Sequence, residues 1–261
     1  MSSIVTDRGL VHYEAYGRGR PVIFLHCWLG SWSYWVNTME VLKDRYRTYA
    51  LDFWGFGDSA KKGEQFGVSD YVEMVTQFME RMGLERAPVM GHSMGGTVSL
   101  SLALAHPERV EKVAVVGSPI SGDGLALILK LAAKRYLAAI AYGVPGALPL
   151  GVRLFSPFLT RDWKRWYGMF EQDLSRTTLH SFHYSIASLR KTDLTPHLRE
   201  IQVPVLGIYG LKDRIVDPEQ GMLLEEHVPL AQVAYFDQSG HFPMLDEPDR
   251  FHETLGEFLD R

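Results

Sequence analysis

The sequence has a single cysteine and no excess of positive charge, and no secretion signal is expected in it. Cys27 is its single cysteine, so no internal disulfide can form, which suits a reducing compartment. The formal net charge is −4, without the basic excess that a nucleic-acid partner requires. The first residues, MSSIVTDRGL, show no basic region followed by an apolar run, so no signal peptide is predicted. We therefore expect a cytoplasmic protein without a nucleic-acid partner.

Long unbroken apolar runs are also missing. Residues 124–142 form the most apolar long stretch, but Lys130, Lys134 and Arg135 interrupt it, which argues against a membrane span. A single amphipathic helix is the expected structure there. No close-spaced set of His, Cys and Asp residues indicates a metal site, so we expect no metal and no other cofactor. Hydrophobic residues make up 46% of the chain, enough for a sizeable core.

Short apolar runs alternate with helical patterns along most of the chain. Six runs rich in Val, Ile, Tyr or Phe lie at residues 21–25, 48–52, 87–91, 113–117, 203–209 and 232–236. Such runs are typical of strands buried on both faces of a parallel sheet. Residues 10–17 alternate instead and predict an antiparallel strand. Helices are predicted from Tyr71 to Met82 and over residues 94–105. The alternation predicts a doubly wound α/β domain.

The alternation stops between about Ser121 and Pro196, where the patterns are helical and no strand is predicted. We interpret residues 121–195 as a helical cap inserted into one α/β core, which comprises residues 1–120 and 196–261. Seven apolar positions of this segment could cover an acyl pocket or pack on the core: Leu125, Leu129, Leu137, Ile140, Leu154, Phe158 and Phe170.

The segment MGHSMGG, residues 90–96, contains the pattern G-x-S-x-G around Ser93. It follows a predicted strand and opens a predicted helix. A sharp turn between the two would strain Ser93 and expose its hydroxyl, and Gly91 and Gly95 would leave room for the crowded backbone. The alternative is a glycine-rich turn that contains an incidental serine.

A serine nucleophile needs a base, and the base needs an acid to orient it. Asp213 follows the predicted strand 203–209, and His241 lies in the loop after the last predicted strand. Parallel α/β sheets place their sites at this carboxyl edge. Taken singly, Asp213 could cap a turn and His241 could lie on the surface. Asp217 is a second candidate acid, although Asp217-Pro218 is typical of a helix start.

With these residues in this order, nearly the whole chain resembles the α/β-hydrolase superfamily, and in particular its serine esterase and lipase-like members with a helical cap. The resemblance implies a mostly parallel eight-stranded sheet flanked by helices. It implies Ser93 as the nucleophile, His241 as general base and then acid, and Asp213 as its partner. It also implies an oxyanion hole formed by the backbone N–H groups of Trp28 and Met94.

The loop His26-Cys27-Trp28 departs from the family's usual His-Gly-x. Cys27 raises the question of whether this position needs a positive φ, which glycine would tolerate better. A catalytic Cys27 is an alternative, but no elbow surrounds it, and His26 should point to the opposite side of an extended strand end. We expect His26 to brace the loop. The segment from Asp52 to Ser59 resembles a structural turn of the family.

The expected activity is that of a cofactor-free serine hydrolase, and its expected partner is a small-molecule ester with a small to medium, mainly apolar acyl group. A serine in the elbow argues against the haloalkane dehalogenase and epoxide hydrolase branches, which resemble this pattern but carry aspartate there. Carbon–carbon bond hydrolases of ring-cleavage products, perhydrolases and small-molecule receptors share the same triad and cap. The motifs leave these three alternatives open.

Overall fold

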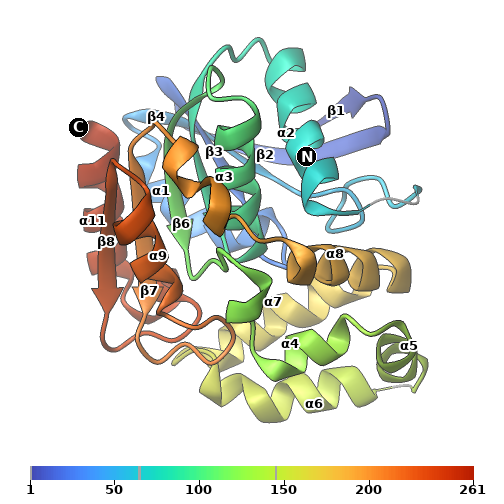
Figure 1. Ribbon diagram of the computed structural model, residues 1–261. Coiled ribbons are helices and arrows are strands. Elements are labelled where there is room, and N and C mark those ends of the chain that lie inside the picture. Colours follow the sequence, from blue (N-terminus) through green and yellow to red (C-terminus); the bar gives the residue numbers. More distant parts are fainter. Residues whose placement is uncertain (1, 64–65, 145) are drawn as a thin grey trace.

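One sheet of eight strands organises the chain (Figure 1). The computed structural model describes residues 2–63, 66–144 and 146–261. The strand order is β1-β2-β4-β3-β5-β6-β7-β8; the β1–β2 and β2–β4 pairs are antiparallel and the other pairs are parallel. The strands are β1 Ser2–Thr6, β2 Gly9–Tyr16, β3 Arg20–Leu25, β4 Tyr46–Leu51, β5 Ala87–His92, β6 Val110–Val116, β7 Val205–Gly210 and β8 Ala231–Phe236. The predicted fold class is therefore confirmed.

Helices connect the strands. They are α1 Val36–Leu42, α2 Val68–Arg81, α3 Met94–Ala105, α4 Leu127–Ala132, α5 Arg135–Gly143, α6 Ala147–Phe155, α7 Trp163–Ser175, α8 Leu179–Lys191, α9 Gln220–His227, α10 Pro243–Asp246 and α11 Pro248–Asp260. α2 packs against α3, and α1 packs against α11. α3 has the bounds predicted for it, and α2 begins where the Asp70 carboxylate accepts a hydrogen bond from the Gly67 N–H, at 2.8 Å.

The six predicted runs correspond to β3 through β8, and residues 10–17 correspond to β2, which is antiparallel as predicted. No apolar run or alternation in the sequence predicted β1. Its residues Ser2–Thr6 alternate between exposed and partly buried positions at the edge of the sheet, and Val5 is 67% exposed. An edge strand that is half in solvent needs no apolar run.

Residues 124–142 do not form the single helix that was predicted. α4 ends at Ala132 and α5 begins at Arg135, with Lys134 in an extended conformation between them. The break places the charged Lys134 and Arg135 in solvent, while each short helix keeps apolar side chains on its inner face. Among the described residues, no helix is long and apolar enough to cross a membrane.

Helices α4 to α8 gather on one side of the sheet, below it in the view of Figure 1. Both ends of this helical segment are fixed to the sheet region. Ser121 forms an isolated β-bridge with Asp193, so the segment begins and ends side by side, and Leu125 forms another bridge with Val216 after β7. The helices therefore lie over the carboxyl edge of the sheet, where the parallel strands β6 and β7 both end.

Lys112 of β6 provides a test of how the C-terminal helix is held. Its buried ammonium donates hydrogen bonds to the carbonyl oxygens of Phe258 (3.0 Å) and Leu259 (3.2 Å) at the end of α11. Terminal helix carbonyls lack intrahelical donors. We expect Lys112→Met to lower the free energy of unfolding in urea by about 1–3 kcal/mol. The exposed Lys43, changed to Met, is the control; equal effects of the two substitutions would contradict this account.

Candidate active site

Ser93 occupies a strained turn between β5 and α3. Its φ is 53° and its ψ is −116°, and its N–H donates a hydrogen bond to the carbonyl of Val116 at 2.8 Å. The glycines around it are required by space, because a Cβ at Gly91 would overlap the Gly95 backbone and a Cβ at Gly95 would overlap the Leu25 carbonyl. The local geometry is thus the strand-to-helix turn that the G-x-S-x-G pattern predicts.

His241 and Asp213 are hydrogen-bonded to each other and buried. His241 Nδ1 lies 2.7 Å from Asp213 Oδ2, and the other carboxylate oxygen accepts the N–H groups of Ile215 (2.7 Å) and Val216 (3.1 Å). Because an ionised carboxylate can only accept a hydrogen bond, we assign the proton of this contact to His241 Nδ1. This tautomer leaves Nε2 without a proton and able to accept one.

Asp217, the second candidate acid, is placed differently. Its Oδ1 accepts a hydrogen bond from the Glu219 N–H at 3.0 Å, in the turn that precedes α9. That contact is the helix-start role considered for it. The structure brings Asp213, and not Asp217, to the His241 ring.

Two residues that the sequence argument had not singled out lie directly against His241. The His92 Nε2–H donates a hydrogen bond to the His241 carbonyl at 2.7 Å, and burial lowers the pKa of His92 well below its ordinary value. Gly117 has a φ of 51°, and a Cβ there would lie 3.3 Å from both His241 Nδ1 and Asp213 Oδ2. His92 occupies the first x of G-x-S-x-G, and Gly117 is the last residue of a predicted strand. Their positions next to the motif and at the sheet edge were the only features of the sequence that could have indicated these roles.

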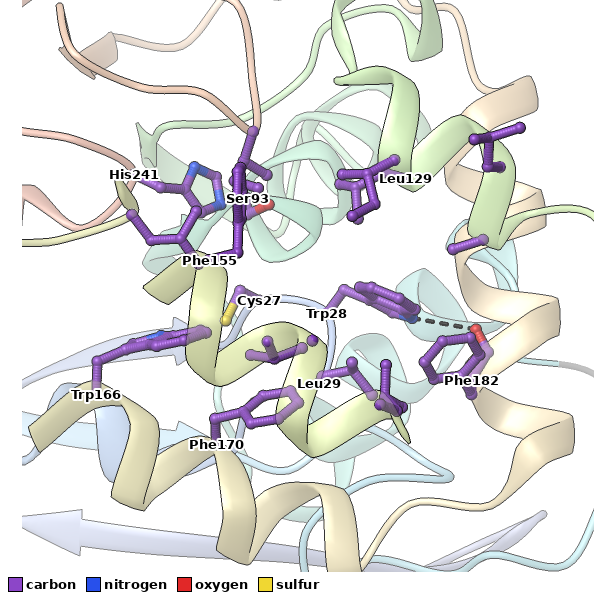
Figure 2. Close-up of a pocket in the computed structure, with 18 of the residues that line it drawn as sticks. Cys27, Trp28, Leu29, Ser93, Leu129, Phe155, Trp166, Phe170, Phe182 and His241 are labelled. Carbon is purple, nitrogen blue, oxygen red and sulfur yellow. Dashed lines mark hydrogen bonds between the residues drawn. The ribbon is translucent and has the colours of Figure 1, made fainter. Parts of the chain in front are cut away.

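Ser93 and His241 face one cavity. Figure 2 shows them at one end of it, with Trp166 and Phe170 at the other. Within the described residues, no hydrogen bond joins the Ser93 hydroxyl to His241. Such contacts are often long in a free enzyme and tighten once substrate is bound.

The loop after β3 accommodates Cys27 without strain. Among the described non-glycine residues, positive φ occurs at Leu29 (58°) and Ser93, and not at Cys27. The Gly30 N–H donates to the Cys27 carbonyl at 3.1 Å, which closes a tight turn. The position that glycine usually fills in the family therefore does not require glycine here, and the unusual backbone lies two residues later.

Cys27 is not paired with His26 as a nucleophile with its base. The His26 Nδ1–H donates to the Cys27 carbonyl at 2.7 Å, and Nε2 accepts the Phe53 N–H at 2.9 Å. Burial lowers the pKa of His26 to about 4 and raises that of the Cys27 thiol. Both groups stay neutral near pH 7, and His26 braces the loop as expected.

The two expected oxyanion donors, the backbone N–H groups of Met94 and Trp28, are not used by the secondary structure of the described residues. Met94 is the first residue of α3, so its N–H has no intrahelical acceptor. The Trp28 N–H takes part in no backbone hydrogen bond in the described part of the chain. The Trp28 ring is anchored, since its Nε1–H donates to the Phe182 carbonyl at 3.1 Å, the dashed line of Figure 2.

The cavity has a volume of about 360 Å³. Its wall consists of Cys27, Trp28, Leu29, Tyr34, Ser93, Ile128, Leu129, Leu131, Ala132, Leu137, Ala147, Leu148, Gly151, Val152, Phe155, Leu159, Trp166, Phe170, Phe182, Leu189, Ile215, His241 and Phe242. No Lys, Arg, Asp or Glu side chain is among these described lining residues. The cavity therefore suits an uncharged, largely apolar ligand.

Three of the seven apolar positions considered for the pocket line it, namely Leu129, Leu137 and Phe170. The others do not. Leu125 is buried outside the cavity, and exposed fractions of 60% for Ile140, 70% for Leu154 and 53% for Phe158 place these three in solvent. They lie on the outer faces of short helices, which a pattern of apolar residues alone does not distinguish from the inner faces.

A group of His12, Asp52 and Asp58 has the spacing of a metal site, with donor atoms within 4.8 Å of one another. Protein donors already occupy its carboxylates. Asp52 accepts the N–H groups of Trp32 (2.7 Å) and Asp58 (2.9 Å), and Asp58 pairs with Arg176 at 2.9 Å. The segment from Asp52 thus acts as the structural turn that was predicted.

One buried acid lies on α7. Asp173 shares the inner face of that helix with Trp166 and Phe170, is 3% exposed, and has no hydrogen-bond partner for Oδ2 in the described residues. Burial is the main reason that its pKa is raised from 3.8 to about 7.

Comparisons with known proteins agree with this fold. The family model of the alpha/beta hydrolase fold matches residues 20–144. The chain is 28% identical to a 2-hydroxy-6-oxo-6-phenylhexa-2,4-dienoate hydrolase of Burkholderia cepacia, over 98% of this chain and 94% of that protein. It is 27% identical to a pimeloyl-acyl-carrier-protein methyl ester esterase of Vibrio cholerae, over 96% of this chain and 98% of that protein.

A solved structure, the enol-lactonase of Burkholderia xenovorans LB400, matches with a TM-score of 0.86 at 22% identity and covers 100% of both chains. At that identity the likeness supports the fold alone. The curated relatives are hydrolases of differing substrate, so they do not select one ester or one carbon–carbon bond.

The raised pKa of Asp173 should make the stability of the fold depend on pH. Between pH 3.8 and about 7 the folded protein holds a proton that the unfolded chain has lost, so this residue makes stability fall as pH rises through that range. Asp173→Asn should therefore raise the free energy of unfolding by about 1–3 kcal/mol at pH 8 and by much less at pH 5. Urea unfolding at both pH values measures this. Asn at the exposed Asp123 is the control, and an Asp173→Asn effect that is equal at both pH values would contradict the prediction.

Proposed function

Because the chain belongs to the α/β-hydrolase superfamily, we propose that it is a serine hydrolase that cleaves uncharged carboxylic esters with small to medium, mainly apolar acyl groups. One observation carries the proposal. The strained Ser93 lines the same cavity as His241, whose ring is hydrogen-bonded to Asp213 behind it, and no charged side chain lines the described wall of that cavity.

In the proposed reaction, Ser93 Oγ attacks the ester carbonyl while His241 Nε2 takes the hydroxyl proton. Asp213 holds the ring and stabilises the imidazolium that forms. The carbonyl oxygen becomes an oxyanion, which the N–H groups of Trp28 and Met94 stabilise. His241 then protonates the departing alcohol and leaves an acyl-Ser93 ester. Water, deprotonated by His241, releases the carboxylic acid and restores the serine.

We propose residues 121–195 as the cap of this site, with residues 1–120 and 196–261 as the core. Helices α4 to α8 supply most of the lining residues. The segment also supports the catalytic loop, because the Leu159 carbonyl accepts the His241 N–H at 3.0 Å and the Thr160 hydroxyl donates to Asp246 at 2.6 Å. Movement of this segment would therefore disturb His241 as well as open the cavity.

The absence of charged side chains from the described cavity wall favours ester hydrolysis over the carbon–carbon bond hydrolase alternative. The relatives named for that chemistry act on dienoates, which carry a carboxylate. A carboxylate buried in this cavity would find no lysine or arginine among the described lining residues, and an unpaired buried charge is strongly unfavourable. A neutral ester meets no such penalty.

The first test is hydrolysis of a p-nitrophenyl ester series from acetate to long chains, with wild type beside Ser93→Ala and Cys27→Ala. We expect a chain-length optimum in the wild type, because the cavity volume is limited to about 360 Å³. Ser93→Ala should lose about 10⁶-fold in kcat, as in a comparable triad. Cys27→Ala should keep turnover within about tenfold, because a buried neutral thiol takes no part in the chemistry.

Three results would overturn this assignment. Activity retained by Ser93→Ala would exclude Ser93 as the nucleophile, and loss in Cys27→Ala alone would return the cysteine to that role. Ligand-induced stabilisation without turnover by the wild type would instead favour a receptor.

A second test uses charge at the end of the acyl chain. We expect kcat/KM for p-nitrophenyl hexanoate to exceed that for the p-nitrophenyl monoester of adipic acid by about 100-fold or more at pH 8. The adipate chain ends in a carboxylate that the cavity cannot pair, which is a cost of about 3–5 kcal/mol. Comparable rates for the two esters would mean that a cation reaches the site, and the carbon–carbon hydrolase reading would regain support.

A further inference from the structure

One polar side chain of the cavity wall has no part in the proposed reaction. Tyr34 lies in a short 3-10 helix, Trp32–Trp35, just after the Trp28 loop; it lines the cavity and is 4% exposed. The Trp166 indole N–H is a hydrogen-bonding neighbour of its hydroxyl oxygen, but within residues 2–63, 66–144 and 146–261 the Tyr34 O–H donates to no acceptor. Buried tyrosine hydroxyls usually donate to a partner. A molecule in the cavity could supply the missing acceptor.

The position of this hydroxyl is fixed by packing. The Tyr34 ring stacks on Phe242, with centroids 5.9 Å apart and planes at 28°, and Phe242 directly follows His241. Gly30 also lies so close that a Cβ there would be 3.3 Å from the Tyr34 ring. Burial raises the pKa of Tyr34 well above its ordinary value, so the group remains a neutral O–H donor.

The other polar groups of the wall are committed or enclosed. The Trp28 indole N–H is used by the Phe182 carbonyl, and the Trp166 indole N–H is fully buried beside the Tyr34 hydroxyl oxygen. Cys27 offers a weak thiol donor. Apart from Ser93 and His241, Tyr34 is thus the described lining residue with a strong hydrogen-bonding group available to a ligand.

We propose that Tyr34 is a specificity-determining residue whose hydroxyl donates a hydrogen bond to a second, uncharged oxygen on the acyl group. The preferred substrates are then oxo-substituted acyl esters over plain alkanoates of the same length. This inference rests on the proposed ester hydrolysis. A plain alkanoate leaves the Tyr34 O–H without an acceptor in an apolar cavity, whereas a ketone oxygen on the acyl chain accepts its hydrogen bond. One neutral hydrogen bond corresponds to a preference of about 3–10-fold in kcat/KM.

The experiment compares p-nitrophenyl hexanoate with the 4-oxohexanoate and 5-oxohexanoate esters, using wild type and Tyr34→Phe. For each protein, kcat/KM for an oxo ester is divided by that for hexanoate. This ratio cancels any general damage caused by the substitution, and comparing the ratios between proteins cancels the intrinsic reactivity of the esters. We expect the wild-type ratio to exceed the Tyr34→Phe ratio by about 3–10-fold for at least one oxo position.

Tyr71→Phe is the matched control. Tyr71 is also fully buried, with the Ser185 side chain as its neighbour, and its O–H also donates to no acceptor in the described residues, but it does not line the cavity. Its substitution should leave the ratios unchanged. The proposal is wrong if Tyr34→Phe keeps the wild-type ratio for both oxo esters, or if Tyr71→Phe lowers the ratio as much. If Tyr34→Phe does not fold, Tyr34→Met replaces it in the same comparison.

A binding measurement separates this inference from the proposed function. Thermal shifts are recorded with 2-octanone, 2,5-octanedione and 2,6-octanedione, which cannot be hydrolysed as esters. The wild type should be stabilised more by at least one dione than by 2-octanone, and Tyr34→Phe should lose that difference. No difference in the wild type would refute the oxygen subsite, even if esters are hydrolysed. A Tyr34-dependent difference in a protein that hydrolyses no ester would refute the ester assignment and keep the subsite.

Discussion

The crowded turn between β5 and α3 is the constraint on which the rest of the site depends. A non-glycine residue with positive φ costs about 1–3 kcal/mol and persists when its surroundings over-determine it. Here those surroundings are the Val116 carbonyl, which holds the Ser93 N–H, and the absence of side chains at Gly91 and Gly95. The turn sets both the serine hydroxyl and the first N–H of α3 at the carboxyl edge of the sheet.

Neutral buried histidines set the electrostatics around that turn. His26 and His92 each use a ring N–H on a backbone carbonyl, and burial lowers the pKa of both. They fix the loop after β3 and the loop of His241 without adding charge. Asp213 therefore lies next to His241 with two backbone N–H groups on its other oxygen. In such a water-poor region, oriented dipoles act more strongly than they do in water.

The helices over the cavity are less well predicted from local sequence patterns than the strands of the sheet. Their amphipathic patterns gave helical segments but not the break at Lys134, and they did not tell inner from outer faces at Ile140 and Leu154. A helix on a surface cavity has apolar residues on more than one side, since one side meets the cavity and another remains in solvent. Local periodicity cannot decide which is which, because that depends on how each short helix is oriented on the core.

The sequence by itself determined the strands β2 to β8, the bounds of α3, and the candidate residues Ser93, Asp213 and His241, because these depend on local periodicity and on short motifs. The tertiary structure alone decided that Asp213 rather than Asp217 reaches His241, that Cys27 needs no positive φ, that His92 and Gly117 support the histidine, and that Tyr34 faces the cavity. Each of these depends on where loops from distant strands end in space. Neither spacing nor composition encodes that position in a form that can be read along the chain.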